Sequence, residues 1–127
     1  MLRACHRLLR PGGRLAFYTI FATPGLSRRD YRRALRSGPN HLSTRRVEHR
    51  DLLEAAGFRL LQGRDLTPQF LRTARAWYDG RSRFEAELRR ADGDAYFEER
   101  QRDGIIQIRA IEDGLLRRAV FVATRSG

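Results

Sequence analysis

The apolar positions at the start of the chain predict a helix followed by a buried strand. From Leu2, apolar side chains recur at i, i+3, i+6 and i+7, which is helical spacing, and the pattern stops at Pro11-Gly12-Gly13. Residues 14–22 are β-branched and aromatic with no polar alternation, as in strands that are covered on both faces. A helix, a turn and a buried strand together indicate an α/β sheet.

The rest of the chain alternates between helical and extended patterns with recognisable boundary residues. Ser27 and Asp30 form a capping box for a helix that Gly38-Pro39 ends. Thr67-Pro68 predicts another helix start, with Thr67 as the N-cap, and Gly80 predicts its end. The predicted elements after the first strand are a helix over 27–37, a helix from about Ser43 or Thr44 to Gly57, a strand over 58–65, a helix over 67–80, a short helix capped by Ser82 and Glu85, a helix over 94–113 and a strand over 115–124.

Three buried strands are too few for a complete doubly wound sheet. The strand at 14–22 needs a neighbour on each side and cover on each face, and the chain supplies too few partners. We therefore predict a single α/β domain over residues 1–127 that is part of a larger sheet, with the missing strands on the N-terminal side. Residues 67–113 form a predicted helical insertion between the last two strands.

Charge is the main anomaly of the composition. The chain has 26 basic residues, all of them Arg, against 15 acidic ones, and residues 1–64 carry +10 of the net charge of +11. The use of Arg even at ordinary surface positions favours a codon bias over 26 separate guanidinium functions. The asymmetry leaves open a nucleic-acid-binding surface, or a surface that balances an acidic segment outside this chain.

The cysteine and histidine content predicts neither a disulfide nor a metal site. The single Cys5 has no intramolecular partner, and together with His6, His41 and His49 it shows no metal-ligand spacing. The opening segment is interrupted by Arg throughout, so it has no apolar core of a signal peptide and no run long enough to span a membrane. We expect a cytoplasmic protein.

Three segments carry a resemblance to a known family. Residues 6–17 (HRLLRPGGRLAF) resemble the R-x-L-[RK]-P-G-G-x-[LF] segment of class I S-adenosylmethionine-dependent methyltransferases, where a helix ends at Pro-Gly-Gly and enters the fifth strand. Residues 51–58 (DLLEAAGF) look like the helix and turn before the sixth strand, and residues 119–123 (AVFVA) look like the seventh. The resemblance is to the C-terminal half of small-molecule methyltransferases of the type 11 and type 25 kind, and it covers essentially the whole chain.

The resemblance implies a partial Rossmann-like sheet in which the equivalent of the seventh strand is antiparallel. Strand 115–124 would lie between 14–22 and 58–65. The resemblance also implies S-adenosylmethionine as the cofactor. The Gly-rich loop after a first strand and the acidic residue after a second strand, which hold that cofactor, have no counterpart in this chain. No cofactor-binding residue is therefore identified.

The resemblance implies methyl transfer from S-adenosylmethionine to a small-molecule acceptor, with this chain as the substrate-side part. Ligands of open α/β sheets bind beyond the carboxyl ends of the strands, so Phe21 and Thr23 are expected to face the acceptor. Trp77 and Tyr78, together with Phe70, either pack in the core or form an aromatic wall for the acceptor.

A general base, where the reaction uses one, is expected to be a histidine. His41 in a loop is the candidate for this role, because an imidazole titrates in the range that such a base needs, and it is favoured over His49 on a helix. Methyl transfer often needs only proximity and orientation of the two reactants. The catalytic residue is therefore left open.

The strand at 14–22 also bears on the partners of the chain. Without its neighbour this strand presents a flat apolar edge, which predicts self-association or pairing with a complementing chain. Activity of the chain alone is therefore not predicted. Two alternatives remain: an inactive fragment of a truncated reading frame, and a basic nucleic-acid-binding module. The module is disfavoured because Arg is scattered over helix faces with no known binding signature.

Overall fold

The computed structural model describes residues 1–39, 42 and 47–126. The order of helices and strands predicted from the sequence is confirmed. The elements are α1 (Leu2–Leu8), β1 (Arg14–Ala22), α2 (Arg28–Ser37), α3 (His49–Ala55), β2 (Phe58–Asp65), α4 (Thr67–Arg83), α5 (Glu85–Asp92), α6 (Asp94–Glu112) and β3 (Leu116–Arg125). The predicted start of the third helix at Ser43 or Thr44 lies outside the described residues, and α3 itself begins at His49.

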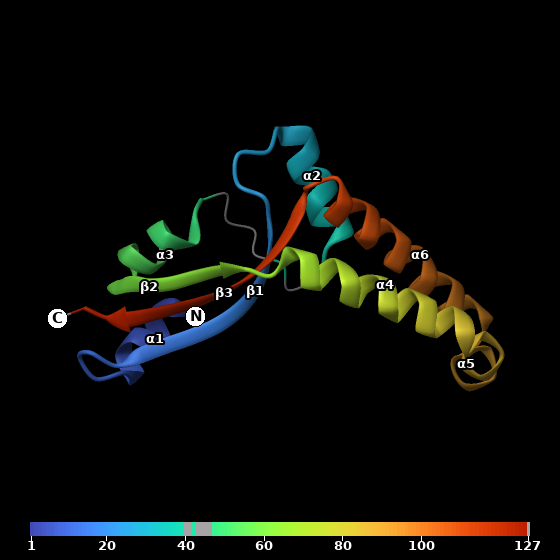
Figure 1. Ribbon diagram of the computed structural model, residues 1–127, viewed down its shortest axis with the longest axis horizontal. Helices are drawn as coiled ribbons and strands as arrows, with labels where there is room; N and C mark the ends of the chain where they lie inside the picture. Colours follow the sequence, from blue (N-terminus) through green and yellow to red (C-terminus); the bar gives the residue numbers. More distant parts are fainter. Residues whose placement is uncertain (40–41, 43–46, 127) are drawn as a thin grey trace.

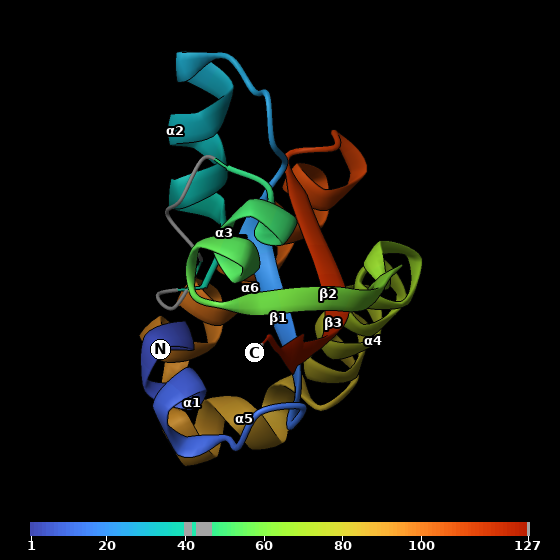
Figure 2. The ribbon, with the colours of Figure 1, turned by 90° about the vertical axis from the view of Figure 1, so that its left-hand side faces the viewer.

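The three strands form one sheet with β3 in the middle. The order is β1-β3-β2, and β3 is antiparallel to both neighbours, so β1 and β2 run parallel to each other. This is the predicted sheet order, with the last strand between the other two. The sheet twists strongly, and β2 crosses the direction of β1 in the view of Figure 2.

One face of the sheet is covered by α1 and α3. Leu53 of α3 is fully buried and packs with Phe58 and Ala123 of the sheet. Leu2 and Leu9 from the first helical segment pack against the same cluster. Strand alternation therefore turns one set of side chains of β1 and β3 toward these two helices.

The other face is covered only in part. Ile20 and Ala22, at the carboxyl end of β1, pack with residues of α2, α4 and α6 in a second core cluster that includes Leu116. Toward the start of β1 this cover ends, and the side chain of Tyr18 is 64% exposed. One face of β1 is therefore exposed to solvent along the first part of the strand. This agrees with the prediction that the chain does not supply all the cover that this strand needs.

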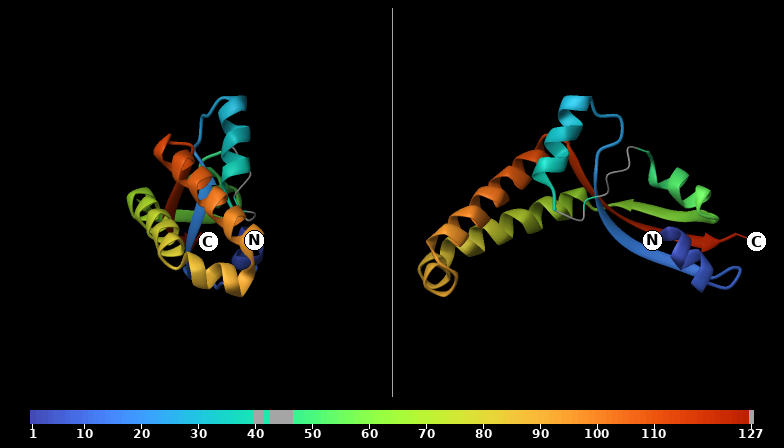
Figure 3. Two further views of the ribbon diagram at one scale, coloured as in Figure 1. Left: turned by 90° about the vertical axis from the view of Figure 1, so that its right-hand side faces the viewer. Right: turned by 180° about the vertical axis from the view of Figure 1, so that it is seen from behind.

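The helices between β2 and β3 form a projecting arm, which we call the helical arm (α4 to α6). Helices α4 and α6 lie side by side, and α5 closes their far end (Figures 1 and 3). Both chain termini lie at the opposite end of the sheet (Figure 1). The arm extends beyond the carboxyl ends of β1 and β2, because α4 leaves from the end of β2 and β3 starts at the same edge.

Two predicted helix boundaries are wrong at the start and end of α4. Thr67 is the first helical residue, and its hydroxyl and backbone N–H both donate to Oδ1 of Asp65, at 2.5 and 3.1 Å. Asp65 thus supplies the oxygen that the prediction assigned to Thr67. Gly80 does not end the helix, since α4 continues to Arg83 along α6 and this packing outweighs the cost of about 1 kcal/mol for a helical glycine.

The capping box predicted at the start of the short helix is not formed. Phe84 occupies the N-cap position of α5, and no side chain caps this helix. For the capping box predicted at the start of α2, the role of the serine is confirmed: Oγ of Ser27 accepts a hydrogen bond from the backbone N–H of Asp30 at 3.1 Å. Gly57 is also correct as a helix terminator, with a φ of +90°.

We predict that Leu53→Ala lowers the free energy of unfolding by about 2–5 kcal/mol, because it opens a cavity between α3 and the sheet. Urea denaturation followed by circular dichroism measures this loss. Leu61→Ala is the matched control, since Leu61 of β2 is 41% exposed, and it should cost less than about 1 kcal/mol. Equal losses in the two variants would contradict the packing of α3 described above.

Candidate functional site

His49 lies at the centre of an aromatic cluster near the carboxyl end of β1. Its imidazole stacks on Phe121 with the ring centroids 4.8 Å apart and the planes 20° apart. Phe21 meets it edge-on at 4.7 Å, and Phe17 lies at 6.4 Å. His49 itself is only 7% exposed. The histidine is thus enclosed by three phenylalanine rings of the sheet.

The strands place these rings on one face through their alternation and register. Phe17 and Phe21 are four residues apart on β1, so both side chains leave the same face of the sheet. Phe17 is the direct partner of Phe121 on β3. Because α3 begins at His49, the first turn of that helix sets the imidazole over this aromatic surface.

The environment of His49 favours its neutral form. Burial lowers the pKa of His49 below its ordinary value of 6.5, and the negative charge of Glu48 opposes this effect without cancelling it. A neutral imidazole has one nitrogen free to accept a proton, so the group has the chemistry of a general base near neutral pH.

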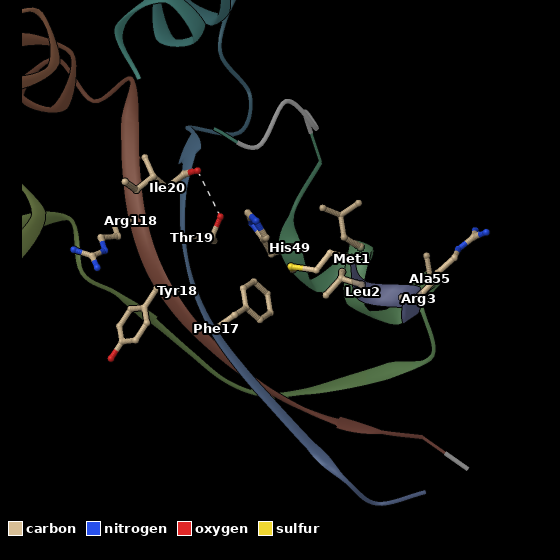
Figure 4. A pocket seen from close by; sticks show the side chains of 12 residues that line it. Met1, Leu2, Arg3, Phe17, Tyr18, Thr19, Ile20, His49, Ala55 and Arg118 are labelled. Carbon is tan, nitrogen blue, oxygen red and sulfur yellow. Dashed lines mark hydrogen bonds between the residues drawn. The ribbon is translucent and has the colours of Figure 1, made fainter. Parts of the chain in front are cut away.

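Two cavities meet at His49. The larger, of about 770 Å³, is lined by residues of α1 and α3 and by residues 17–20 of β1. Figure 4 shows Phe17, Thr19 and His49 on one side of β1, and Tyr18 and Arg118 on the other. This cavity therefore wraps around the outer edge of β1.

The smaller cavity, of about 400 Å³, lies at the carboxyl ends of β1 and β2. Phe21 and His49 lie in its aromatic wall, and Asp65 and Arg117 form part of its charged rim. Burial raises the pKa of Asp65, but hydrogen bonds from Thr67 and the charge of Arg117 outweigh burial and hold this pKa below its ordinary value. Arg117 contacts the Asp65 carboxylate at 3.2 Å, so the rim combines a fixed anion with a cation.

The structure brings only one of the four predicted acceptor residues to this site. Phe21 lines the smaller cavity beside His49. Thr23 lies at the end of β1, where its hydroxyl donates to the backbone oxygen of Gly114 at 2.5 Å. Its side chain thus links the end of β1 to the turn before β3.

The other two predicted residues lie on the helical arm. Trp77 is 65% exposed and lines a separate cavity of about 730 Å³ between α4 and α5. Tyr78 lies on the side of α4 that faces Gly104 of α6. Core packing is the correct interpretation for Phe70, which is buried, and the wrong one for Trp77.

The histidines show what sequence reasoning could and could not find. His41, the predicted candidate base, lies outside the described residues. His49, which the sequence analysis ranked below it, is the one that the structure sets between two cavities. The aromatic residues of β1 and β3 were visible as a pattern, but no local signal shows which helical residue covers them.

The described residues offer no metal site and no membrane-spanning helix. Among residues 1–39, 42 and 47–126, no group of three or more His, Cys, Asp or Glu side chains is placed to hold a metal ion. Within the same residues, no helix combines the length and the apolar character that crossing a membrane requires.

Comparison with known proteins gives matches in structure and none in sequence. No protein-family model matches the chain, and no curated protein matches it. Several solved structures match over nearly the whole chain, including the following three. The first is a candidate sarcosine dimethylglycine methyltransferase from Galdieria sulphuraria, with a TM-score of 0.83 and 15% identity over 98% of this chain and 46% of that one. The second is phosphoethanolamine N-methyltransferase 2 from Haemonchus contortus, with a TM-score of 0.82 and 13% identity over 99% of this chain and 29% of that one. The third is the cyclopropane synthase MmaA2 from Mycobacterium tuberculosis, with a TM-score of 0.71 and 18% identity over 97% of this chain and 48% of that one.

The chain has a methyltransferase fold. Within the described part of the chain, the six helices and the antiparallel three-stranded sheet correspond to part of that fold, as the resemblance in the sequence implied. The chain spans half or less of the length of these three neighbours. The neighbour from Haemonchus contortus was solved with S-adenosylhomocysteine and phosphomonomethylethanolamine bound.

The residues that the structure describes do not by themselves fit the cofactor of such enzymes. Among the described residues, one strand runs through a glycine turn into a helix: β1 leads through Gly25, with a φ of +81°, into α2. The start of α2 is already capped by Ser27, and Asp30 places a carboxylate in its first turn. This turn therefore does not replace the missing Gly-rich loop.

We predict that the free energy of unfolding decreases as the pH falls from about 7.5 to about 5, because of His49. Its pKa is lower in the folded state, so near and below 6.5 the unfolded chain takes up the proton first and is favoured. One such group gives a slope of at most about 1.4 kcal/mol per pH unit. Urea denaturation across this range measures the slope.

His49→Phe is the control, since it keeps an aromatic ring among the phenylalanines and removes the titrating group. Its slope over the same pH range should be flatter than that of the unsubstituted chain. An unchanged slope in this variant would show that the pH dependence arises elsewhere.

Proposed function

We propose that this chain is the acceptor-side part of an S-adenosylmethionine-dependent methyltransferase that acts on a small molecule in the cytoplasm. Its methyltransferase fold, matched over 97–99% of its length, supports the proposal. Segments outside the chain hold the cofactor, since the residues present do not. The chain forms one functional domain, in which the helical arm is the insertion beside the acceptor.

The observation that carries the proposal is the open outer edge of β1. Among the described residues β1 pairs only with β3, along nine residues and without irregularity. The other outer strand, β2, has a bulge at Leu61, which is one of the devices that protect sheet edges. A regular edge beside a cavity of about 770 Å³ is the place where a further strand of the sheet fits.

In this proposal the acceptor lies beyond the carboxyl ends of β1 and β2. Phe21 and Thr23 stand at that edge, and Trp77 and Tyr78 belong to the arm that extends past it. His49 is the group suited to take a proton from the acceptor, because it is held neutral beside both cavities. The main task of these residues is to orient the acceptor.

The basic composition gives the alternative nucleic-acid function no structural support. The described Arg side chains include five that pair with carboxylates of the same chain.

We predict that the 127-residue chain alone does not bind S-adenosylhomocysteine, while a longer product of the same reading frame does. The reading frame upstream of codon 1 is read first, and the intact mass of the native protein is measured as a check. Isothermal titration with S-adenosylhomocysteine is then carried out on both proteins. The expected result is an upstream strand, a Gly-rich loop and a helix, with binding only in the longer protein.

A native mass of 14.8 kDa, together with a stop codon upstream, would overturn the single-chain form of the proposal. In that case a separate complementing chain is required. A longer protein that binds no cofactor would overturn the proposed function itself.

The backbone hydrogen bonds of β1 show which of its N–H groups face the open edge. Arg125 donates its N–H to Gly13, and Thr23 donates its N–H to Leu115. Along an antiparallel pair of strands, every second residue exchanges backbone hydrogen bonds with its partner, and the residues between point their backbone groups the other way. The odd-numbered residues of β1 therefore bond to β3, and the even-numbered ones point their backbone groups to the outer edge. The N–H of Tyr18 therefore faces outward and that of Thr19 faces β3.

We predict that the chain self-associates through β1 and that Tyr18→Pro abolishes this association without unfolding the sheet. Proline removes the outward N–H and is tolerated on an edge strand. Size-exclusion chromatography with light scattering measures the association. Tyr18→Ala, which loses the side chain and keeps the N–H, should still associate.

Thr19→Pro is the second control, because it removes an N–H that bonds to β3. It should destabilise the fold, as a thermal melt will show. Association that persists in Tyr18→Pro would mean that the chains meet elsewhere.

A further inference from the structure

A second charged cavity lies on the helical arm, away from His49. It has a volume of about 540 Å³ and is formed where the C-terminal end of α2 meets α4 and α6. Its lining includes Arg36, Arg81 and Arg100 but only one carboxylate, that of Asp103. Three guanidinium groups against one carboxylate give this cavity a positive charge.

Arg81 is held in a fixed position in this cavity. Its Nε donates to Oε1 of Gln101 at 2.7 Å. The amide nitrogen of Gln101 donates in turn to Oγ of Ser82 at 2.8 Å and to the backbone oxygen of Tyr78 at 3.2 Å. These bonds orient the guanidinium without neutralising it, since Gln101 carries no charge.

The glycine in the middle of α6 makes room for this arrangement. A Cβ at Gly104 would lie 2.7 Å from Nη2 of Arg81, closer than such atoms approach. Glycine inside a helix costs about 1 kcal/mol relative to alanine. The sequence thus has a helix-weakening residue at a position of α6 against which the Arg81 guanidinium lies.

The positive charge of Arg81 is not compensated by an anion in the described structure. No ion pair among residues 1–39, 42 and 47–126 includes Arg81, whereas Arg100 contacts Asp103 at 3.2 Å. Burial and the neighbouring charge of Arg100 lower the pKa of Arg81, which remains protonated at neutral pH. A partly buried, unpaired guanidinium is stabilised by an added anion.

We propose that this cavity binds an oxyanionic group, a carboxylate or a phosphate, with Arg81 as its main ligand. A guanidinium presents its donors in a planar fork that matches both groups. The cavity is concave and no larger than a small ligand needs, which favours a compact anion over an extended polyanion.

The site lies on elements that leave the carboxyl edge of the sheet. Helix α2 follows β1 and helix α4 follows β2, so both helices leave the sheet at the edge where open α/β sheets bind their ligands, and Arg36 and Arg81 lie in their last turns. As part of this proposal, we assign the anion to the methyl acceptor as its charged end. This assignment to the acceptor rests on the proposed function, whereas the anion site itself rests only on the contacts of Arg81.

The test is a titration of the 127-residue chain with inorganic phosphate and, separately, with acetate, followed by NMR or calorimetry. Arg81→Gln should weaken binding of the preferred anion about tenfold or more, because a charge-assisted pair is lost. Arg90→Gln is the matched control, since it removes the same charge from an exposed position on α5 outside the cavity. It should change binding less than about twofold.

Gly104→Ala is a second variant that keeps the net charge. Its methyl group displaces the guanidinium and should weaken binding as Arg81→Gln does, while a thermal melt shows that the helix is retained. Equal effects of Arg81→Gln and Arg90→Gln, or no saturable binding of either anion, would overturn the anion site.

The two proposals fail in distinguishable ways. Anion binding is measured without cofactor, so a chain that binds phosphate or acetate but never supports methyl transfer keeps the anion site and loses the proposed function. A functional enzyme whose activity is unchanged by Arg81→Gln overturns the role of the anion in the acceptor. The preference between phosphate and acetate identifies which group the acceptor carries.

Discussion

The antiparallel pairing of β3 between β1 and β2 fixes where everything else in the chain lies. Because β3 runs against both neighbours, it starts at the edge where they end. The long connection from β2 to β3 must therefore leave from that edge and return to it, which makes α4 and α6 an antiparallel pair. Helix α2 leaves from the same edge after β1. The walls of the charged cavity follow from this one pairing.

The same pairing builds the surroundings of His49. The register sets Phe17 opposite Phe121, and alternation brings Phe21 onto the same face. Ala119 and Ala123 flank Phe121 on that face of β3, and their small side chains leave space for α3 to approach. An imidazole placed there loses water on most sides, so its charged form is disfavoured. The lowered pKa of His49 is thus a consequence of sheet geometry.

Local patterns were sufficient to predict the order of elements and of strands, since periodicity and turn residues such as Gly57 act over a few positions. They failed where distant packing decides. Gly80 is a plausible helix end in the sequence, yet α4 runs through it along α6. The contact of Arg81 with Gly104 joins residues on two helices, and the cover of the phenylalanines by His49 joins a helix to two strands. No pattern within one element contains either contact.

The contacts of individual arginines divide them into two kinds. The interpretation as a codon bias still suits surface arginines such as Arg89, whose guanidinium pairs with Glu85, Asp94 and Glu98. It does not explain Arg81, since a helical glycine and a glutamine network are arranged around that one guanidinium. The high overall arginine content and the positioning of Arg81 are therefore separate features of this chain. Only the geometry around each side chain separates the two.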